Sequence, residues 1–436
     1  MNPKVSIILT SYNKPNLIGK AIESVMNQTY SEWELFIMDD NSNEKTLRII
    51  ERYLNDKRIY YFNSQVKDED RYKTTRYATL INTAMPMTKG EYITYLTDDT
   101  EYLPQRLNRM VKFLEENSSI HVVYSGQLVC RVDQHFKTIS KFTRHTRGKL
   151  DKAANKVDHC SVMHTKKIAG EVLNKYGSYW NDDPKYWHNG DAGFWSRLNE
   201  VDSFYPINKV LDRSYKTPHS FQNLNAYLPE NIPNGTLVKG LSKDIYLIDN
   251  QRRRLITDDM FRRLKYDSKK VVEVPDPFLF KYSLGPEINS TVFKDHALMP
   301  NYRLVKTPHS ARVYYIENNQ KRRFESSVTL RKYRFKLQDA VEVGEEYLRL
   351  IPNGTLITHR ITRDTILPEN VLFRVKHNYF LSQENSFHPI SYKVLMKLNL
   401  TKVNSVSLQE KETSFFKKGK SIFWKIGEQE KETKWT

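Results

Sequence analysis

The chain has few of the residues that stabilise disulfide-rich or transmembrane proteins. Its 436 residues include only two cysteines, Cys130 and Cys160, which excludes a disulfide framework and a zinc site built from cysteines. No apolar run approaches the roughly 20 residues that a membrane-spanning helix needs. Because scarce cysteine fits a reducing compartment, we expect a cytoplasmic protein.

Two phosphate-binding signatures are also missing. Neither a Gly-X-Gly-X-X-Gly fingerprint nor a Gly-X-X-X-X-Gly-Lys loop follows the first predicted strand, which argues against Rossmann-type dinucleotide enzymes and P-loop enzymes. Helix-turn-helix, zinc-finger and RNA-recognition signatures are absent from the sequence as well. We therefore expect no nucleic-acid partner.

Charge of one sign is in excess. The sequence has 69 Lys and Arg against 51 Asp and Glu, which gives a formal net charge of +18. Such an excess raises the local concentration of anionic partners. Nucleotides, an anionic polymer and a phospholipid surface all fit, so the protein could also lie peripherally at a membrane.

The first half of the chain alternates apolar strand patterns with helical patterns. The short links between them predict an α/β fold, with a mostly parallel sheet and helices on both faces. Ligands bind at the carboxyl ends of the strands in this architecture. The predicted strands are 5–9, 33–38, 59–62, 92–96 and 122–124, and the predicted helices are 17–26, 44–54, 75–85 and 107–116.

From about residue 225 the sequence repeats itself. The hexapeptide Ile-Pro-Asn-Gly-Thr-Leu occurs at 232–237 and 351–356, and basic turns recur at 252–254 and 321–323. A period of roughly 70 residues with turn signals predicts a β-rich repeat array. Its basic and aromatic residues could form glycan- or polyanion-binding faces, or solvated turns and small cores. The predicted segments are a first domain at 1–225, repeats at 226–296, 297–365 and 366–408 (together 226–408), and a charged tail at 409–436.

Two predicted strands end in adjacent carboxylates. Asp98 and Asp99 follow one strand, and Asp39 and Asp40 follow another. Neighbouring acids repel each other unless a cation, an arginine or a helix N-terminus compensates, and Mg²⁺ or Mn²⁺ holding a diphosphate would do so. The alternative is that both pairs cap helices or form turns.

The carboxyl ends of parallel strands meet at one edge of a sheet, so these acids should lie near the end of the first strand. That strand ends in Thr10, Ser11 and Tyr12. The group could form a nucleotide pocket, with Tyr12 stacked on a base and Asp99 on a metal ion. An Asp99 buried against a lysine with no room for a metal would count against this hypothesis.

Segments 5–13, 36–43 and 90–99 resemble family 2 glycosyltransferases of the GT-A fold, in particular those of spore coat polysaccharide biosynthesis. Further matching blocks extend the resemblance over about residues 3–220. It implies a nucleotide-diphospho-sugar transferase domain. It also implies inverting transfer of a sugar from a UDP or dTDP donor to a hydroxyl acceptor in cell-surface or spore-coat polysaccharide synthesis.

The resemblance also implies roles for individual residues. Asp99 is the expected ligand of Mg²⁺ or Mn²⁺, although Thr97 stands where the family's Asp-X-Asp motif has its first acid. Asp191 matches the proposed catalytic base, with Asp158 as the second candidate. The residues expected to contact the nucleotide are Thr10, Tyr12, Asp39, Asp40, Arg71, Arg76, Asp98 and Asp99.

A competing hypothesis keeps the fold without the chemistry. The chain would then be a non-catalytic protein that binds nucleotide sugars or glycans, with the repeats attaching it to a wall polymer. Donor turnover by the protein distinguishes this hypothesis from the transferase.

Overall fold

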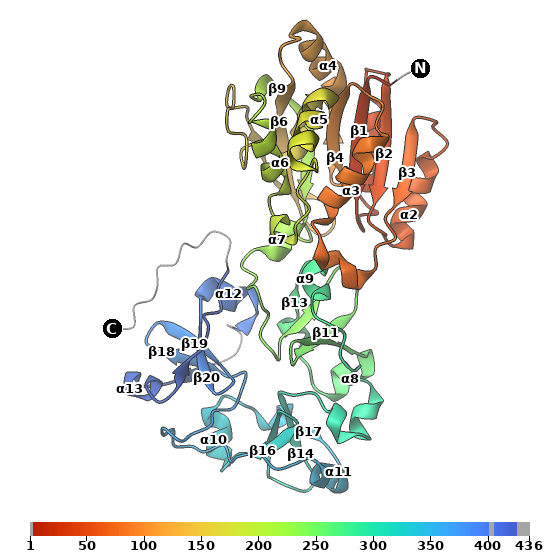
Figure 1. The fold of residues 1–436 in the computed structure, drawn as a ribbon. Coiled ribbons are helices and arrows are strands. Elements are labelled where there is room, and N and C mark those ends of the chain that lie inside the picture. Colours follow the sequence, from red (N-terminus) through yellow and green to blue (C-terminus); the bar gives the residue numbers. More distant parts are fainter. Residues whose placement is uncertain (1–2, 401–404, 425–436) are drawn as a thin grey trace. The chain divides into compact units, whose positions relative to one another are not determined.

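The computed structural model describes residues 3–400 and 405–424 of the chain. The chain divides into two compact units, Met1–Asn223 and Leu224–Thr436 (Figure 1). Among the described residues, no helix is both long enough and apolar enough to cross a membrane.

The first unit is built on a nine-stranded sheet in the order β3-β2-β1-β4-β8-β6-β9-β5, with β7 paired to β6. Its first four strands in that order run parallel, and β8 lies antiparallel to both of its neighbours. The predicted mostly parallel sheet is therefore confirmed. The strands are β1 Val5–Ser11, β2 Trp33–Asp39, β3 Ile59–Asn63, β4 Tyr92–Thr97, β5 Thr100–Tyr102, β6 Val122–Val132, β7 Thr138–Arg144, β8 Val162–Thr165 and β9 Tyr205–Lys216.

Helices cover both faces of this sheet. Successive side chains of a strand point to opposite faces, so neighbouring residues of one strand pack against different helices. Ile8 of β1 packs in one apolar cluster with α3, α5 and α6. Its neighbours Ile7 and Leu9 pack in a second cluster with α1, α2 and α4. The helices are α1 Ile18–Met26, α2 Glu44–Ile50, α3 Arg76–Ala84, α4 Arg106–Glu116, α5 Lys166–Tyr176, α6 Gly190–Leu198 and, at the end of the unit, α7 Phe221–Asn225.

The second unit contains three sheets with one repeated topology. In each sheet a strand pairs antiparallel with the next strand along the chain and parallel with a later, short strand. The first sheet consists of β10 Leu237–Lys239, β11 Ile245–Asp249, β12 Arg252–Ile256 and β13 Val272–Glu273; the second of β14 Arg303–Lys306, β15 Tyr314–Glu317, β16 Gln320–Arg323 and β17 Val341–Glu342; the third of β18 Leu372–Val375, β19 Asn378–Gln383, β20 Ser386–Ile390, β21 Val406–Ser407 and β22 Lys417–Lys418. The helices of this unit are α8 Asp258–Arg263, α9 Asp276–Phe280, α10 Ser327–Lys332, α11 Glu345–Leu350, α12 Tyr392–Lys397 and α13 Glu410–Thr413.

Each of these three sheets packs against both others. Leu247 of the first sheet shares an apolar cluster with Ile316 of the second, and the second and third sheets share another cluster. A further cluster joins Val238 of the first sheet to Leu372 of the third. The arrangement is thus closed, with every sheet in contact with the other two.

Equivalent residues of the three sheets meet at the centre of the second unit. Gly235, Tyr302 and Asn370 each donate a backbone N–H to a carbonyl of the second strand of their sheet, which is β11, β15 or β19. All three have positive φ, of 82°, 65° and 57°. A Cβ added to Gly235 would lie 2.0 Å from Nδ2 of Asn370 and 3.0 Å from Tyr302. Glycine is therefore the residue that fits at this position.

The repeated hexapeptide does not mark equivalent positions. Gly235 of the first copy has positive φ, whereas Gly354 of the second copy follows a different strand and donates to the carbonyl of Lys321. The basic segments expected as turns lie in β12 and β16. Within them Arg254 and Arg322 are buried and pair with Asp249 and Glu317, whereas Arg252 and Arg323 are exposed. Neither Arg254 nor Arg322 belongs to an exposed polyanion-binding face.

Part of the predicted charged tail belongs to the third sheet. Residues 409–424 include α13 and β22, and β22 pairs with β20. The apolar rings of Phe415 and Phe416 pack against the cluster between the second and third sheets. This burial explains why the segment is ordered despite its many charges. The rest of that tail, residues 425–436, lies outside the described residues.

Candidate active site

The ends of β1, β2 and β4 form one edge of the first sheet, as parallel pairing requires. The backbone N–H of Tyr12 donates to Oδ2 of Asp98 at 2.8 Å, and the N–H of Asp98 donates to the carbonyl of Thr10 at 3.2 Å. The N–H of Asp40 donates to the carbonyl of Ser11 at 2.9 Å. The structure therefore brings both acid pairs and the end of β1 together.

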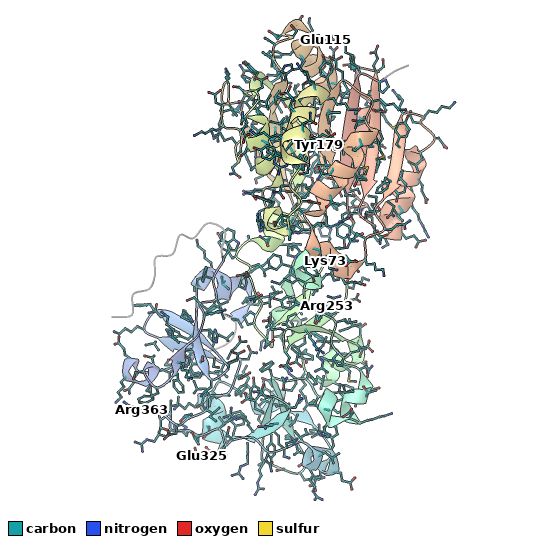
Figure 2. All side chains as sticks on the ribbon, in the orientation of Figure 1. Lys73, Glu115, Tyr179, Arg253, Glu325 and Arg363 are labelled. Atoms are coloured by element: carbon teal, nitrogen blue, oxygen red, sulfur yellow. The ribbon has the colours of Figure 1, made fainter. Side chains whose placement is uncertain are left out.

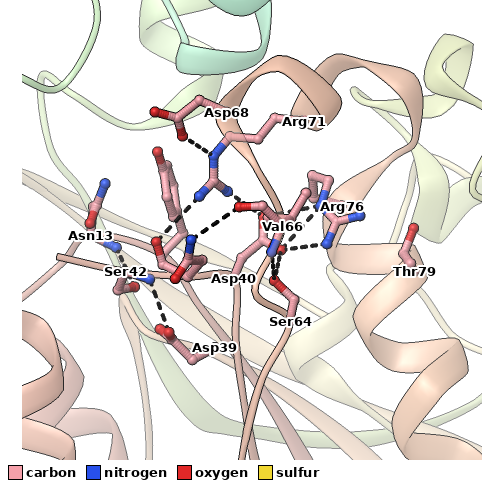
Figure 3. Close-up of polar contacts among 12 residues, drawn as sticks. Asn13, Asp39, Asp40, Ser42, Ser64, Val66, Asp68, Arg71, Arg76 and Thr79 are labelled. Atoms are coloured by element: carbon pink, nitrogen blue, oxygen red, sulfur yellow. Dashed lines mark hydrogen bonds and ion pairs between the residues drawn. The ribbon is translucent and has the colours of Figure 1, made fainter.

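Asp40 is neutralised by two arginines (Figure 3). Nη1 of Arg71 lies 2.8 Å from Oδ2 of Asp40, and Nη2 of Arg76 lies 2.6 Å from Oδ1. The hydroxyl of Ser64 donates to Oδ1 at 3.0 Å. A buried carboxylate needs paired charges and hydrogen bonds, and these contacts provide both for Asp40.

Arg71 also fixes the ring of Tyr12. Its guanidinium lies 4.2 Å from the ring centroid, within the range of a cation–π contact. The Arg71 side chain is only 2% exposed and is held on its other side by Asp68, 2.9 Å away. The aromatic ring at the end of β1 is therefore held in place by a buried network.

Asp39 lies deeper than Asp40. It is fully buried, and burial raises the pKa of its carboxyl group, although hydrogen bonds from Ser42 oppose the shift. Its Oδ2 accepts from the N–H of Ser42 at 2.9 Å, but its Oδ1 has no hydrogen-bond partner among the described residues. Such a buried acceptor could be satisfied by an N–H group of a ligand.

The second acid pair faces a lysine. Nζ of Lys14 lies 2.9 Å from Oδ1 of Asp98 and 2.8 Å from Oδ2 of Asp99. Burial raises the pKa of Asp98. Burial also acts to raise the pKa of Asp99, but the charges of Lys14 and Lys216 outweigh it and hold that pKa below its usual value. The positive charge at this acid pair is thus the ammonium of Lys14. This is the lysine contact that counts against the metal hypothesis.

A third group of polar side chains lies at the turn His159–Ser161, just before β8. Ligand atoms of Asp158, His159 and Cys160 lie within 4.8 Å of one another, so they could in principle share a metal ion. Oδ2 of Asp158, however, is paired with Arg144 at 3.0 Å. The turn also reaches the second acid pair, because the hydroxyl of Thr97 lies 3.5 Å from Sγ of Cys160 and donates to Asp99 at 2.7 Å.

The two candidate bases differ in their pKa. Burial opposes ionisation of Asp158, but the charges of His159, Lys216 and Arg144 outweigh it and lower the pKa of Asp158 to about 2. Burial raises the pKa of Asp191, with His159 opposing the shift. Asp191 is therefore the stronger base of the two.

The glycine before Asp191 has a structural reason. A Cβ on Gly190 would lie 2.6 Å from the hydroxyl of Tyr77, which accepts the N–H of Gly190 at 2.8 Å. The glycine permits close approach of a tyrosine of α3.

Sequence reasoning missed several residues at this edge. Lys14, Arg144 and Lys216 were not singled out, and basic residues are too common in this chain to mark a site. Arg106, the first residue of α4, is also completely buried, and nothing in the sequence distinguishes it from the many exposed arginines. It donates to the carbonyl of Cys160 at 2.7 Å and to Thr94 at 3.0 Å.

Comparison with known proteins agrees with this architecture. The sequence model of the family described as Glycosyl transferase family 2 matches residues 6–169. Protein CgeD of Bacillus subtilis (strain 168) is 45% identical over 404 residues, which span 92% of this chain and 91% of that protein. The chain belongs to glycosyl transferase family 2. Its first unit has the GT-A fold of that family, as predicted.

More distant similarity is confined to part of this family 2 chain. The GalNAc(5)-diNAcBac-PP-undecaprenol beta-1,3-glucosyltransferase of Campylobacter jejuni is 26% identical over 207 residues, covering 47% of this chain and 62% of that protein. The crystal structure of S. aureus TarS 1–349 with UDP-GlcNAc is similar over 52% of this chain and 62% of that chain, at 15% identity and a TM-score of 0.39.

Proposed function

We propose that this family 2 protein is an inverting, metal-dependent glycosyltransferase. It moves a sugar from a UDP or dTDP donor to a hydroxyl group of a cell-surface or spore-coat polysaccharide. The observation that carries the proposal is the meeting of two acid pairs at one sheet edge, where Tyr12 contacts Asp98 and Arg71 joins Tyr12 to Asp40. Family membership supports the reaction class.

The nucleoside binds at the ends of β1 and β2. The base stacks on Tyr12, whose ring Arg71 already holds, and Oδ1 of Asp39 accepts an N–H of the base. Thr10 and Asp40 complete this part of the site. Arg76, whose side chain is 12% exposed, lies where it can also face a phosphate.

The Asp98–Asp99 pair offers the carboxylate oxygens that Mg²⁺ and Mn²⁺ prefer, but the ammonium of Lys14 lies against both carboxylates. A divalent ion can therefore bind here only after Lys14 has moved away. Asp99 would hold the ion, and Asp98 would support it from the nucleotide side. When bound, the ion neutralises the diphosphate leaving group.

Asp191 acts as the general base. As the acceptor hydroxyl attacks the anomeric carbon, its proton passes to the Asp191 carboxylate and the bond from that carbon to the diphosphate oxygen breaks. A single displacement inverts the anomeric centre. Asp158 serves this purpose less well, because its ion pair with Arg144 and its pKa of about 2 make it a weak base.

Donor turnover tests the proposal. A panel of UDP and dTDP sugars is screened by thermal shift with and without Mn²⁺, and the stabilising donors are assayed for hydrolysis and transfer. We expect Asp99→Ala to abolish turnover and Asp191→Ala to reduce it by roughly 10²-fold or more. Asp183→Asn is the control, because this carboxylate is 43% exposed and paired with Lys185.

Two other outcomes would redirect the assignment. Nucleotide-sugar binding with no turnover on any acceptor would favour the non-catalytic binding protein. Failure of every nucleotide sugar and nucleoside diphosphate to bind, with Mn²⁺ present, would refute the proposal for the site itself.

We propose that residues 1–225 form the transferase domain and that the three repeats at 226–408 hold a polymeric glycan acceptor. The excess of basic residues supports an anionic polymer or membrane surface as a further partner of a cytoplasmic, peripheral protein. Co-sedimentation of the full chain with purified wall polymer and with anionic vesicles tests this, and binding to neither would refute it.

A further inference from the structure

Lys14 provides the cation of the Asp98–Asp99 pair. It lies in the loop between β1 and α1, and its side chain is 28% exposed. Its single ammonium contacts one oxygen of each carboxylate, at 2.9 and 2.8 Å. Two adjacent buried acids would otherwise repel each other, so Lys14 compensates them.

The remaining oxygens of this pair are also occupied. Oδ2 of Asp98 accepts the N–H of Tyr12 at 2.8 Å, and Oδ1 of Asp99 accepts the hydroxyl of Thr97 at 2.7 Å. A divalent ion that binds Oδ2 of Asp99 must therefore take the place of the ammonium. Two cations cannot share this position, because their repulsion is strong at such short range.

We propose that Lys14 and the divalent ion compete for Asp99, and that the nucleoside diphosphate resolves the competition. When the donor binds, its phosphates give the displaced ammonium a new anionic partner. Without nucleotide the metal ion binds weakly, because Lys14 competes for Asp99. With the nucleotide present the metal ion binds much more tightly. This inference rests on the proposed function, because it requires a diphosphate at the same edge.

Lys14 is suited to such an exchange, whereas the arginines of the first acid pair are not. Arg71 is nearly fully buried and bonded to both Asp40 and Asp68, so its release would leave buried charges unpaired. A lysine is a point charge on a flexible chain with no fixed fork geometry. Lys14 also reaches solvent, so it can move without disturbing the core.

Direct measurement of Mn²⁺ binding tests the competition. Isothermal titration or the Mn²⁺ electron paramagnetic resonance signal gives the affinity with and without UDP and dTDP for the full-length wild type and for Lys14→Met. We expect Lys14→Met to bind Mn²⁺ alone at least tenfold more tightly. We also expect nucleoside diphosphate to increase Mn²⁺ affinity in the wild type, and this increase to shrink in the variant.

Lys4→Met is the matched control. Lys4 also pairs with two carboxylates, Glu115 at 2.8 Å and Glu91 at 3.6 Å, so its replacement removes the same charge. Lys4 is also remote from the candidate site. Its partner Glu115 lies at one end of the first unit, and Lys73, two residues after Arg71 of the candidate site, lies at the other end (Figure 2). Lys4→Met should leave Mn²⁺ affinity within twofold of the wild type.

A conservative variant guards against a folding defect. Lys14→Arg keeps the positive charge and should bind free Mn²⁺ as weakly as the wild type. Unchanged, weaker or undetectable Mn²⁺ binding by Lys14→Met, or equal tightening by Lys4→Met, would overturn the inference. If neither nucleotide binds the wild type even with Mn²⁺, the proposed function fails instead, while the comparison of free Mn²⁺ affinities still decides the competition.

Discussion

Arg106 donates a hydrogen bond to the carbonyl of Cys160 at 2.7 Å. This bond ties the start of α4 to the turn that follows Asp158, beneath the candidate active site. The guanidinium also lies 3.8 Å from the ring centroid of Tyr102, and its charge opposes the upward shift of the pKa of Asp212. A single buried arginine thus connects a helix, a strand and the turn His159–Ser161.

Replacement of Arg106 should destabilise the protein. Arg106→Met removes hydrogen bonds to buried acceptors and leaves Asp212 without a compensating charge, so we expect a loss of about 3 kcal/mol in the free energy of unfolding. Urea denaturation measures this loss. Arg109→Met is the control, because Arg109 is exposed on the same helix and bonds only Gln105; its effect should stay within about 0.5 kcal/mol.

The pH dependence of turnover should report Asp191. Burial raises the pKa of this carboxyl, and a base works in its deprotonated form. Activity should therefore fall as the pH drops through a value above the ordinary carboxyl range of about 4. The dependence of kcat/KM on pH measures this limb, and a limb at or below pH 4 would contradict the assignment.

Removal of the charge of His159 should shift this limb. His159 opposes the upward shift of the Asp191 pKa, so His159→Gln should move the acid limb to higher pH. His135→Gln, in the exposed turn after β6, should leave it in place. A shift to lower pH in His159→Gln would show that Asp191 is not the titrating group.

The two histidines near β8 should differ in protonation state at neutral pH. Burial lowers the pKa of His164 to about 4. Burial acts in the same direction on His159, but the neighbouring Cys160 and Asp158 outweigh it and raise its pKa to about 10. Nitrogen-15 NMR at pH 7 should show a neutral ring for His164 and an imidazolium for His159.

The free energy of unfolding should depend on the titration of His159. Because the folded-state pKa of His159 is raised, its contribution is fully present below pH 6.5 and is lost as the pH rises towards 10. His159→Gln should therefore cost more stability at pH 6 than at pH 10 in urea denaturation. An equal cost at both pH values would mean that His159 is neutral in the folded protein.

The centre of the second unit should tolerate no side chain at Gly235. Gly235→Ala places a methyl group against Asn370 at a residue with φ of 82°, so we expect a loss of about 2 kcal/mol. Thermal and urea unfolding of the full chain measure it. Gly344→Ala, at the N-cap of α11 where a Cβ meets no atom within 4 Å, should lose no more than about 1 kcal/mol. Equal effects would contradict the close meeting at the centre.

The sheet of the first unit could be predicted because its signals are local. Apolar runs such as Val5–Ser11 are buried along their whole length, and the acids that follow parallel strands necessarily reach one edge. The Lys14–Asp99 contact could not be predicted in this way, since it joins residues 85 positions apart. It depends on the path of a loop and the reach of one side chain.

In the second unit, identical sequence segments did not mark structurally equivalent positions. Gly235, Tyr302 and Asn370 are equivalent by their backbone hydrogen bonds but share no residue type. The structure conserves a backbone conformation with positive φ there, which glycine, asparagine and a strained tyrosine can all adopt. Sequence repetition therefore revealed the period, and only the backbone revealed the register.

The mutual packing of the first and third sheets has a consequence for how this region can change. An open stack can gain or lose a copy at either end and keep its other interfaces. Here, deletion of one copy would strip an apolar flank from both survivors, and insertion of a fourth would require every interface to be rebuilt at a new angle. A change in copy number should therefore cost far more than a substitution or the growth of a loop on the outer surface of this region.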